Sequence, residues 1–545
     1  MSTESGGDAD RDRDLDLTEE LFEALYEGDD DAVVRALRAG APAEAADEDG
    51  QTALYLAASQ DRPGTVRLLL AKGADPDRAS GPEADELPLC GTAVWGHTEV
   101  MSSLLAAGAR PDLEENPGVR ALTWACRQGR AEVAELLLAS GADPDLPGPD
   151  GDPPLVTAAR RGSPSCVRAL LRHGARARAE ALAEARRWLD LDVEEELRRT
   201  LSEPEPEPEP GPEGKGAVTV ARQVEEDGGV TVVVELIGDR GLLRSVEQQT
   251  GHAAIVTLLE DTVGVHPPAD ELAARALGCG DPDRDDWTEA VAVLQRRGDE
   301  ETFRAAAAWC GTEDALRQAF AADVLAGLGA VDAVDAEPTE PAGRTEAAGR
   351  TGPASTEGEA PGRGIFVARV VPLLRELARA ADEPELIRAA VAGLGQQGDP
   401  AALPEILRHA GHDDPEIRFG VAVALHGLVP GDHAEAVRVL LGLTRDSDDG
   451  VRDWATTALA DVEADSPEIR EALAARLTDQ VPDIEAEAAR GLAMRQDARA
   501  VEALARILAE EDPEGYAYST AEQAVEYVED EPARRRLEAT VPRTH

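Results

Sequence analysis

Two histidines and two aspartates form the group whose spacing most resembles that of metal ligands: His409, His412, Asp413 and Asp414. A zinc site needs three or four side chains that converge on one point. The two aspartates directly precede a helical pattern, where an aspartate usually caps the helix by accepting a backbone hydrogen bond. We therefore expect these residues to serve the fold, and we predict no bound metal.

A glycine pattern that could cradle a dinucleotide occurs as GxGxxG from Gly393 to Gly398. A dinucleotide site needs this pattern between a strand and a helix. Here the pattern ends a helical stretch and runs into a turn, so it predicts a helix stop. The motifs GxxxxGK[ST], GxSxG and HExxH do not occur. We expect no cofactor and no catalytic residue.

The cysteines are scattered and form no CxxC pair, which favours a reducing cytosol over a disulfide framework or a zinc ribbon. A small buried hydrophobe is the expected role of each. The five are Cys90, Cys126, Cys166, Cys279 and Cys310.

The elements that would position any site begin with a repeat in the first third of the chain. A Gly-Ala pair recurs at a nearly constant interval, with its glycines at Gly40, Gly73, Gly108, Gly141 and Gly174. Each glycine follows an apolar helical segment and can supply the positive φ that ends it. A second short helix precedes each of the later segments. One such unit cannot bury its own apolar face, so the units must stack.

This array resembles ankyrin repeats over residues 17 to 178. The stretch GQTALYLAA, Gly50 to Ala58, is close to the family's G-x-T-P-L-H-L-A-A. The family's histidine, which ties adjacent loops together, is replaced by Tyr55, Cys90, Thr123 and Val156, which suggests looser hairpin tips. The resemblance implies an ankyrin domain over 17–202, closed by a helix after residue 179, and preceded by a disordered acidic segment over 1–16.

The middle of the chain changes character several times. Residues 203–216 contain EPEPEPEP and predict an extended Glu/Pro linker. Residues 217–237 alternate around Asp227-Gly228-Gly229 and predict a β-hairpin. Helical patterning resumes at about Leu242 and continues through the rest of 217–330, where residues 301–329 resemble a HEAT unit. Residues 331–363 have no periodicity and predict a disordered insertion.

A second signature repeats from residue 364 onward. Acidic residues and a proline precede Arg388 and Arg418, and DDGVR ends at Arg452, so that the arginines recur at similar intervals. Each arginine leads into a helix of small residues, and it can stack above the next unit's aspartate. Residues 364–545 thus resemble HEAT repeats of the short bacterial kind. The predicted fold class is all-α, with two helical-repeat solenoids and a small β-hairpin element between them.

The ankyrin resemblance also implies which residues face a ligand on the concave side. Trp95 stands out because tryptophan is enriched at interface hot spots, although it can equally fold back onto the neighbouring unit. The arginines suggest an acidic peptide as ligand, unless they are simply solvated. The predicted partner-binding residues are Gln60, Glu86, Trp95, Val119, Arg127, Gln128, Asp152, Arg160 and Arg161.

The net charge of −55 argues against nucleic acid and anionic membranes as partners. No apolar run is long enough to predict a membrane-spanning helix. The N-terminal stretch MSTESGGDADRDRDLDLTEE lacks a signal-peptide pattern, so we expect a cytoplasmic monomer. The predicted function is a non-catalytic scaffold or adaptor that binds protein partners through concave repeat surfaces. The alternatives are a HEAT-repeat enzyme or accessory subunit resembling bilin lyases, and an acidic inhibitor or immunity-type regulator.

Overall fold

The computed structural model describes residues 5–540 except 116–117, 190, 203–217, 227, 239–240, 329–363 and 514. The chain forms two compact units, residues 1–267 with 283–289, and residues 268–282 with 290–545. The predicted linker and the predicted insertion at 331–363 lie outside the described residues. Each unit is built mainly from paired helices, which confirms the all-α class.

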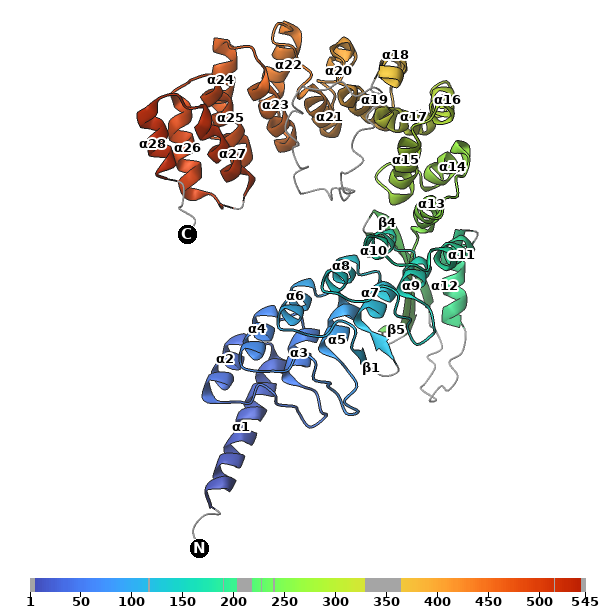
Figure 1. The fold of residues 1–545 in the computed structure, drawn as a ribbon, viewed down its shortest axis with the longest axis vertical. Helices are drawn as coiled ribbons and strands as arrows, with labels where there is room; N and C mark the ends of the chain where they lie inside the picture. Colours follow the sequence, from blue (N-terminus) through green and yellow to red (C-terminus); the bar gives the residue numbers. More distant parts are fainter. Residues whose placement is uncertain are drawn as a thin grey trace. The chain divides into compact units, whose positions relative to one another are not determined.

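The first unit opens with stacked helix pairs (Figure 1). Helices α2, α4, α6, α8 and α10 line one side of the array, and α3, α5, α7 and α9 line the other. Consecutive members of each row are in contact. The elements are α1 (Ser5–Glu27), α2 (Asp30–Ala39), α3 (Ala53–Ser59), α4 (Pro63–Ala71), α5 (Pro88–Trp95), α6 (Thr98–Ala106), β1 (Glu114–Glu115), β2 (Val119–Arg120), α7 (Ala121–Gln128), α8 (Ala131–Ala139), α9 (Pro154–Arg161), α10 (Pro164–Arg172), α11 (Arg178–Leu189) and α12 (Val193–Ser202).

The recurring Gly-Ala pair ends the outer helix of each unit as predicted. Gly73 and Gly141 have φ values of 96° and 94°, which residues with a side chain rarely adopt. The amide of the following alanine then reaches back five residues, from Ala74 to the Leu69 carbonyl at 3.1 Å. This hydrogen bond satisfies a carbonyl that the helix end would otherwise leave unpaired.

The core of the array repeats with the same period as the glycines. Each inner helix buries a small residue completely, for example Ala57, Ala93 and Ala125, and each outer helix buries a leucine such as Leu104 or Leu137. Small inner residues let adjacent helices approach closely, while the leucines fill the space between the two rows. The pattern of one alanine and one leucine for each unit therefore sets the stacking.

Carboxylates link successive units along the loops. Asp77 accepts a hydrogen bond from the Arg110 amide at 2.9 Å, and Asp145 accepts one from the Arg176 amide at 2.8 Å. At the hairpins, the Ser80 hydroxyl accepts a hydrogen bond from the Thr52 amide at 2.8 Å. Where the family's histidine is absent, Ser80 thus provides a tie between two hairpins.

The N-terminal segment departs from the prediction. Helix α1 begins at Ser5, within the residues 1–16 that the sequence predicts to be disordered. Leu21 and Leu25, further along the same helix, are fully buried. Once these residues fix a helix, each further residue adds a hydrogen bond at little extra cost, so the helix extends toward the chain end.

The middle region contains three strands where two are predicted. Strands β3 (Val218–Glu226), β4 (Gly229–Gly238) and β5 (Gly241–Gln249) form an antiparallel sheet in the order β3-β4-β5. The predicted hairpin is β3-β4. The prediction of helix from Leu242 is wrong, because that segment pairs with β4 as a third strand, and tertiary pairing overrides weak local preference.

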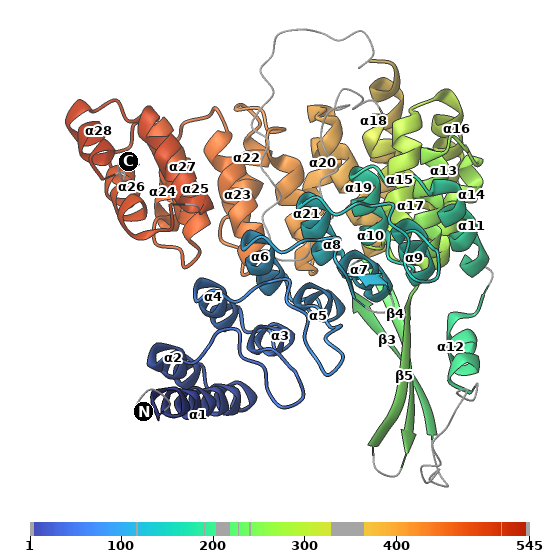
Figure 2. The same cartoon turned by 60° about the horizontal axis from the view of Figure 1, so that its bottom comes forward.

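The sheet belongs to the first unit. Helix α12 lies along it (Figure 2), and Leu197 and Leu201 pack on Val230, Val232 and Val234, which alternate onto one face of β4. Helix α13 (His252–Thr262) follows β5 and shares the core of the helix pairs. The first unit therefore continues to residue 267, beyond the boundary predicted at 202.

The second unit is another double row of helices. One row runs through α17, α19, α21, α23, α25 and α27, each in contact with the next. Helix α17 packs directly on α19 although residues 329–363 lie between them in sequence. The elements are α14 (Ala269–Cys279), α15 (Asp285–Arg297, shared with the first unit), α16 (Glu300–Trp309), α17 (Ala315–Gly327), α18 (Gly364–Ala380), α19 (Pro384–Gln397), η1 (Pro400–Ala402), α20 (Leu403–Leu407), α21 (Pro415–Leu425), α22 (Ala434–Leu443), α23 (Asp449–Asp461), α24 (Pro467–Arg476), α25 (Pro482–Met494), α26 (Arg499–Glu510), α27 (Tyr516–Ala524), η2 (Val525–Tyr527) and α28 (Glu531–Glu538).

Candidate functional site

The residues with ligand-like spacing serve the fold. His409 is buried and contacts the Ala378 carbonyl at 3.1 Å through Nε2. Nδ1 of His412 accepts a hydrogen bond from the Asp414 amide, and Asp414 in turn caps α21 by accepting from the Glu416 amide. Within the described residues, no group of three or more histidine, cysteine, aspartate or glutamate side chains is arranged to hold a metal ion.

The GxGxxG segment is part of helix packing. Gly398, with φ of 64°, ends α19. Gly395 faces α21 so closely that a Cβ there would lie 2.7 Å from the Ala424 Cα. The pattern thus follows from a helix stop and a close helix contact, in agreement with the sequence prediction.

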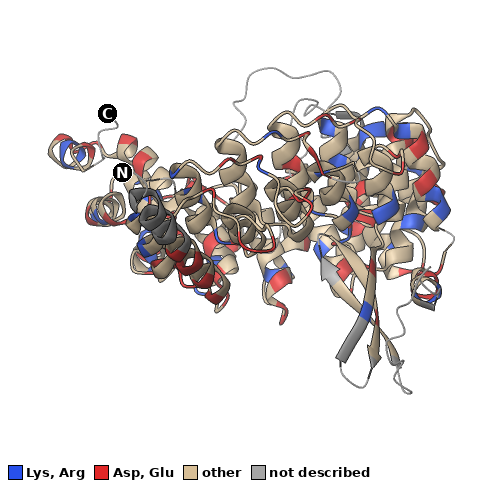
Figure 3. Cartoon of the chain, turned by 90° about the horizontal axis from the view of Figure 1, so that it is seen from below, with Lys and Arg blue, Asp and Glu red and all other residues tan. Residues whose placement is uncertain are grey.

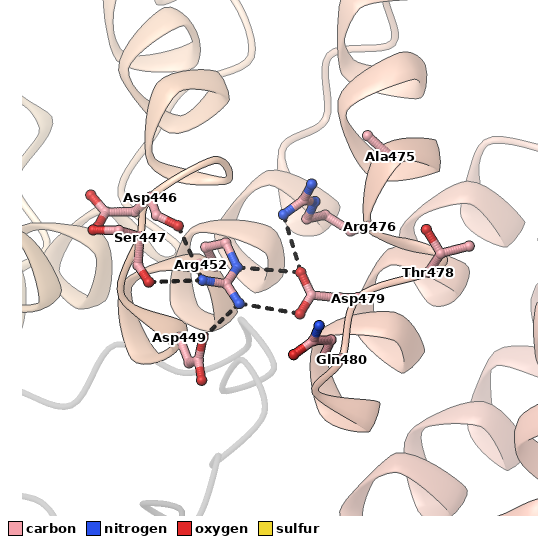
Figure 4. A pocket seen from close by; sticks show the side chains of 9 residues that line it. All are labelled: Asp446, Ser447, Asp449, Arg452, Ala475, Arg476, Thr478, Asp479 and Gln480. Atoms are coloured by element: carbon pink, nitrogen blue, oxygen red, sulfur yellow. Dashed lines mark hydrogen bonds and ion pairs between the residues drawn. The ribbon is translucent and has the colours of Figure 1, made fainter.

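A hollow of about 460 Å³ in the second unit is lined by side chains that form charge pairs with one another (Figure 4). Arg452 donates to both carboxylate oxygens of Asp479 at 3.3 Å and to the main-chain oxygens of Asp446 and Ser447. Arg418 makes the same kind of pair with Asp446, at 2.8 Å for both bonds. These pairs are the predicted arginine–aspartate ladder, and they engage the carboxylates of Asp446 and Asp479 within the chain.

A second hollow, of about 330 Å³, opens on the inner-helix side of the first unit, and we call it the Trp95 pocket. Helices α3 and α5, the hairpin before α5, strand β1 and helix α7 all contribute to it. Its lining residues are Tyr55, Asp85, Glu86, Cys90, Gly91, Val94, Trp95, Glu115 and Trp124. Two of the predicted partner-binding residues, Glu86 and Trp95, therefore lie at one site.

Trp95 is the exposed edge of this pocket, with 63 % of its surface accessible. It is the last residue of α5, before Gly96, whose φ of 84° ends the helix. With this exposure, Trp95 is not buried against the neighbouring unit. An exposed tryptophan on a helix end presents a large rigid surface, as interface hot spots do.

Two carboxylates of the Trp95 pocket are held in place by uncharged donors. Glu115 accepts a hydrogen bond from the Trp124 indole at 2.6 Å and a longer one from the Leu87 amide at 3.4 Å. The Cys90 thiol also donates to Glu115. Burial raises the pKa of Glu115 above its usual range, because the partly desolvated charge is not matched by a positive one.

Glu86 is fixed in the same way. The Gln51 side-chain amide donates to it at 3.2 Å, and the Tyr55 hydroxyl is a further donor. The Tyr55 ring packs against Gly91, where a Cβ would lie 3.1 Å from the ring. Tyr55 and Cys90 stand where the family has its histidine; these departures predict only looser hairpin tips, and in the structure both residues line the pocket. Glu115 and Trp124 carried no sequence signal.

The three predicted arginines are not available as a positive surface. Arg127 pairs with Asp150 at 2.6 Å and lies 5.5 Å from the centre of the Trp124 ring. Arg160 pairs with Asp152 and with Glu184, at 2.7 Å and 3.0 Å. Each guanidinium is paired with a carboxylate of the same chain. The arginines therefore do not form the unpaired positive surface that suggested an acidic ligand.

Arg161 and Val119 are buried and cannot contact a partner. Arg161 is 8 % exposed and is covered by strand β5, which docks on the ends of α7 and α9. Val119 is 3 % exposed because β2 pairs with β1 and turns this side chain inward. Gln60 is exposed and Gln128 is half-buried. Their role as contact residues remains a prediction.

The two parts of the chain match two different classes of helical repeat. The ankyrin repeat model matches residues 49–80, and a model of three ankyrin copies matches residues 89–181. The HEAT repeat model matches residues 371–460 and 442–526. The comparison with curated proteins finds no match. The chain is therefore built of ankyrin repeats in its N-terminal part and HEAT repeats in its C-terminal part, and repeats of both kinds typically serve protein interaction.

Over the described residues, no helix is both long and apolar enough to cross a membrane.

Proposed function

We propose that this chain is a non-catalytic interaction module that binds a protein partner through the ankyrin array, at the Trp95 pocket. The observation that carries the proposal is Trp95 itself, 63 % exposed at the rim of a hollow in which hydrogen bonds fix Glu86 and Glu115. A rigid pocket with an exposed aromatic edge loses little side-chain entropy when a partner docks. Because Glu86 and Glu115 are held by hydrogen bonds within the array, the pocket is preorganised for binding.

Affinity capture tests this proposal. Three proteins are immobilised separately: the unaltered full chain, its Trp95→Ala variant and its Tyr527→Ala variant. The proteins that each one captures from native lysate are quantified by mass spectrometry. Tyr527 is a matched control, because it is an aromatic residue exposed to 43 % in the HEAT array. We expect Trp95→Ala to reduce recovery of the specific partner at least about tenfold, since an aromatic hot spot contributes about 2 kcal/mol or more.

Tyr527→Ala should recover the partner as the unaltered chain does. Both substitutions are at exposed positions, so the two variants should keep the melting temperature of the unaltered chain. Equal recovery with all three proteins would rule out the Trp95 pocket as the binding site.

A further inference from the structure

The chemistry of the Trp95 pocket points to a particular kind of side chain. Three aromatic residues line it, Tyr55, Trp95 and Trp124, together with three acidic residues, Asp85, Glu86 and Glu115. None of the described residues that line it is basic. Aromatic faces attract cations through the ring quadrupole, and a carboxylate adds a directed hydrogen bond. An acidic or purely apolar side chain would lose both interactions.

The carboxylates in this pocket lack a positive counterpart. Among the residues that the structure describes, Glu86 and Glu115 accept hydrogen bonds only from neutral groups: amides, an indole, a hydroxyl and a thiol. Elsewhere on the chain, acidic residues lie among arginines (Figure 3), and many form ion pairs with them. A positive group entering the pocket would therefore find charge that the fold has left uncompensated.

The chain also shows how a guanidinium sits on an aromatic ring in this region. Arg127 lies over Trp124 at 5.5 Å while it donates to Asp150 at 2.6 Å. A planar guanidinium can stack and form a forked hydrogen bond at the same time, which an ammonium group cannot do. Trp95 offers a ring face of the same kind to a group from outside, and Glu86 and Glu115 offer the hydrogen-bond acceptors beside it.

We propose that the Trp95 pocket receives an arginine side chain of the partner, stacked on Trp95 and hydrogen-bonded to Glu86 and Glu115. This inference rests on the proposed function and specifies the partner's chemistry. The partner's contacting segment is basic, and the net charge of −55 would speed its approach. The ligand is thus opposite in charge to the acidic peptide that the arginines of the sequence suggest.

Fluorine NMR of the full chain labelled with 5-fluorotryptophan tests this inference. The chain has six tryptophans, so the signals of Trp95 and Trp124 can be assigned with Trp95→Phe and Trp124→Phe. The probe is N-acetyl-arginine methylamide. Its neutral citrulline counterpart and its lysine counterpart are the matched controls. We expect the arginine probe to shift the signals of Trp95 and Trp124 saturably, with a Kd of about a millimolar, as is typical of a ligand this small.

Charge-neutral variants then locate the hydrogen bonds. Glu86→Gln and Glu115→Gln should each weaken the arginine probe about fivefold or more, because one charge-assisted hydrogen bond is lost. Glu99→Gln, on the outer helix α6, should leave its affinity unchanged, since Glu99 pairs with Arg67 away from the pocket. Unchanged signals of the other four tryptophans show that each variant is folded.

Equal binding of the citrulline or lysine probe, or no saturable shift with the arginine probe, would overturn the arginine assignment. If the arginine probe fails while Trp95→Ala still loses the captured partner, the assignment is wrong and the proposed function stands. If the arginine probe binds as described and Trp95→Ala still recovers the partner fully, the pocket chemistry is right and the proposed function is wrong.

Discussion

Arg161 and Glu247 join the ankyrin array to the sheet that covers its end. The Arg161 guanidinium donates to the Glu247 main-chain oxygen at 2.8 Å and to its carboxylate at 2.5 Å. Beside this pair, the Gln248 side chain donates to the Arg160 carbonyl at 2.7 Å. The last of the predicted contact positions, Arg161, thus holds strand β5 and is closed to a partner.

Removing the Arg161 side chain should loosen the sheet. Arg161→Ala leaves the Glu247 main-chain oxygen and carboxylate without their donor and opens a void, which should cost about 2 to 4 kcal/mol of unfolding free energy. Arg67→Ala is the control, because the Arg67–Glu99 pair is exposed and worth less than about 1 kcal/mol. Hydrogen exchange measured by mass spectrometry should be faster in β5 for Arg161→Ala than for the unaltered chain, and should be unchanged there for Arg67→Ala. Unchanged exchange in β5 would contradict the docking role.

The buried His252 should make the first unit sensitive to acid. Burial lowers the pKa of His252 to about 4, and its ring stacks on Trp188 at 5.3 Å. In the unfolded chain the pKa is about 6.5. The unfolded state therefore binds a proton more readily, and the contribution of His252 to stability is complete above pH 6.5 and lost as the pH falls from 6.5 to 4.

His252→Phe keeps the aromatic stack and removes the titration. The unfolding free energy of this variant, relative to the unaltered chain, should rise by about 2 to 3 kcal/mol between pH 7 and pH 4. Chemical denaturation at several pH values measures this difference, and contributions from all other groups cancel in it. A difference that does not change with pH would show that His252 is not held neutral.

Asp286 should act in the opposite direction. Its side chain accepts a hydrogen bond from the Ala254 amide at 2.6 Å, and burial raises its pKa to about 6. Because the folded state holds the proton more tightly than the unfolded state does, stability falls as the pH rises from about 4 to about 6. The cost of the buried charge is then present at neutral pH.

Asp286→Asn keeps an acceptor for the Ala254 amide and removes this charge. The variant should be more stable than the unaltered chain by about 1 to 2 kcal/mol at pH 7.5, with no gain at pH 4. Thermal or urea unfolding at both pH values distinguishes the two conditions. A loss of stability at pH 7.5 would mean that the charged form makes the better hydrogen bond.

The repeats could be predicted because their signals are local and periodic. The Gly-Ala pairs, the aspartate caps and the arginine spacing each act within one unit or between neighbouring units, so their positions in the sequence determine their contacts. The stop at Gly398 and the Arg418–Asp446 and Arg452–Asp479 pairs follow directly from that spacing.

The Trp95 pocket was only partly predictable. Glu86 and Trp95 occupy positions that the family framework marks as exposed, whereas Glu115 comes from a hairpin of the next unit and has no periodic signal. Strand β5 was missed for a related reason. Its pairing with β4 and its contact with Arg161 join segments far apart in the sequence, and no local pattern reports such a contact.

Two helical glycines of the HEAT array differ in the space around them: Gly395 lies in a close helix contact, and Gly420 faces open space. At Gly395, a Cβ would lie 2.7 Å from the Ala424 backbone, so Gly395→Ala must push α19 and α21 apart. At Gly420, within α21, a Cβ would meet no atom within 4 Å. We expect Gly395→Ala to destabilise the chain by about 1 to 3 kcal/mol, and Gly420→Ala to stabilise it by about 0.5 to 1 kcal/mol. Urea unfolding followed by far-UV circular dichroism measures both. If Gly395→Ala were neutral or stabilising, helix contact would not explain the glycine at position 395 of the GxGxxG segment, and a role in ligand binding would have to be considered again.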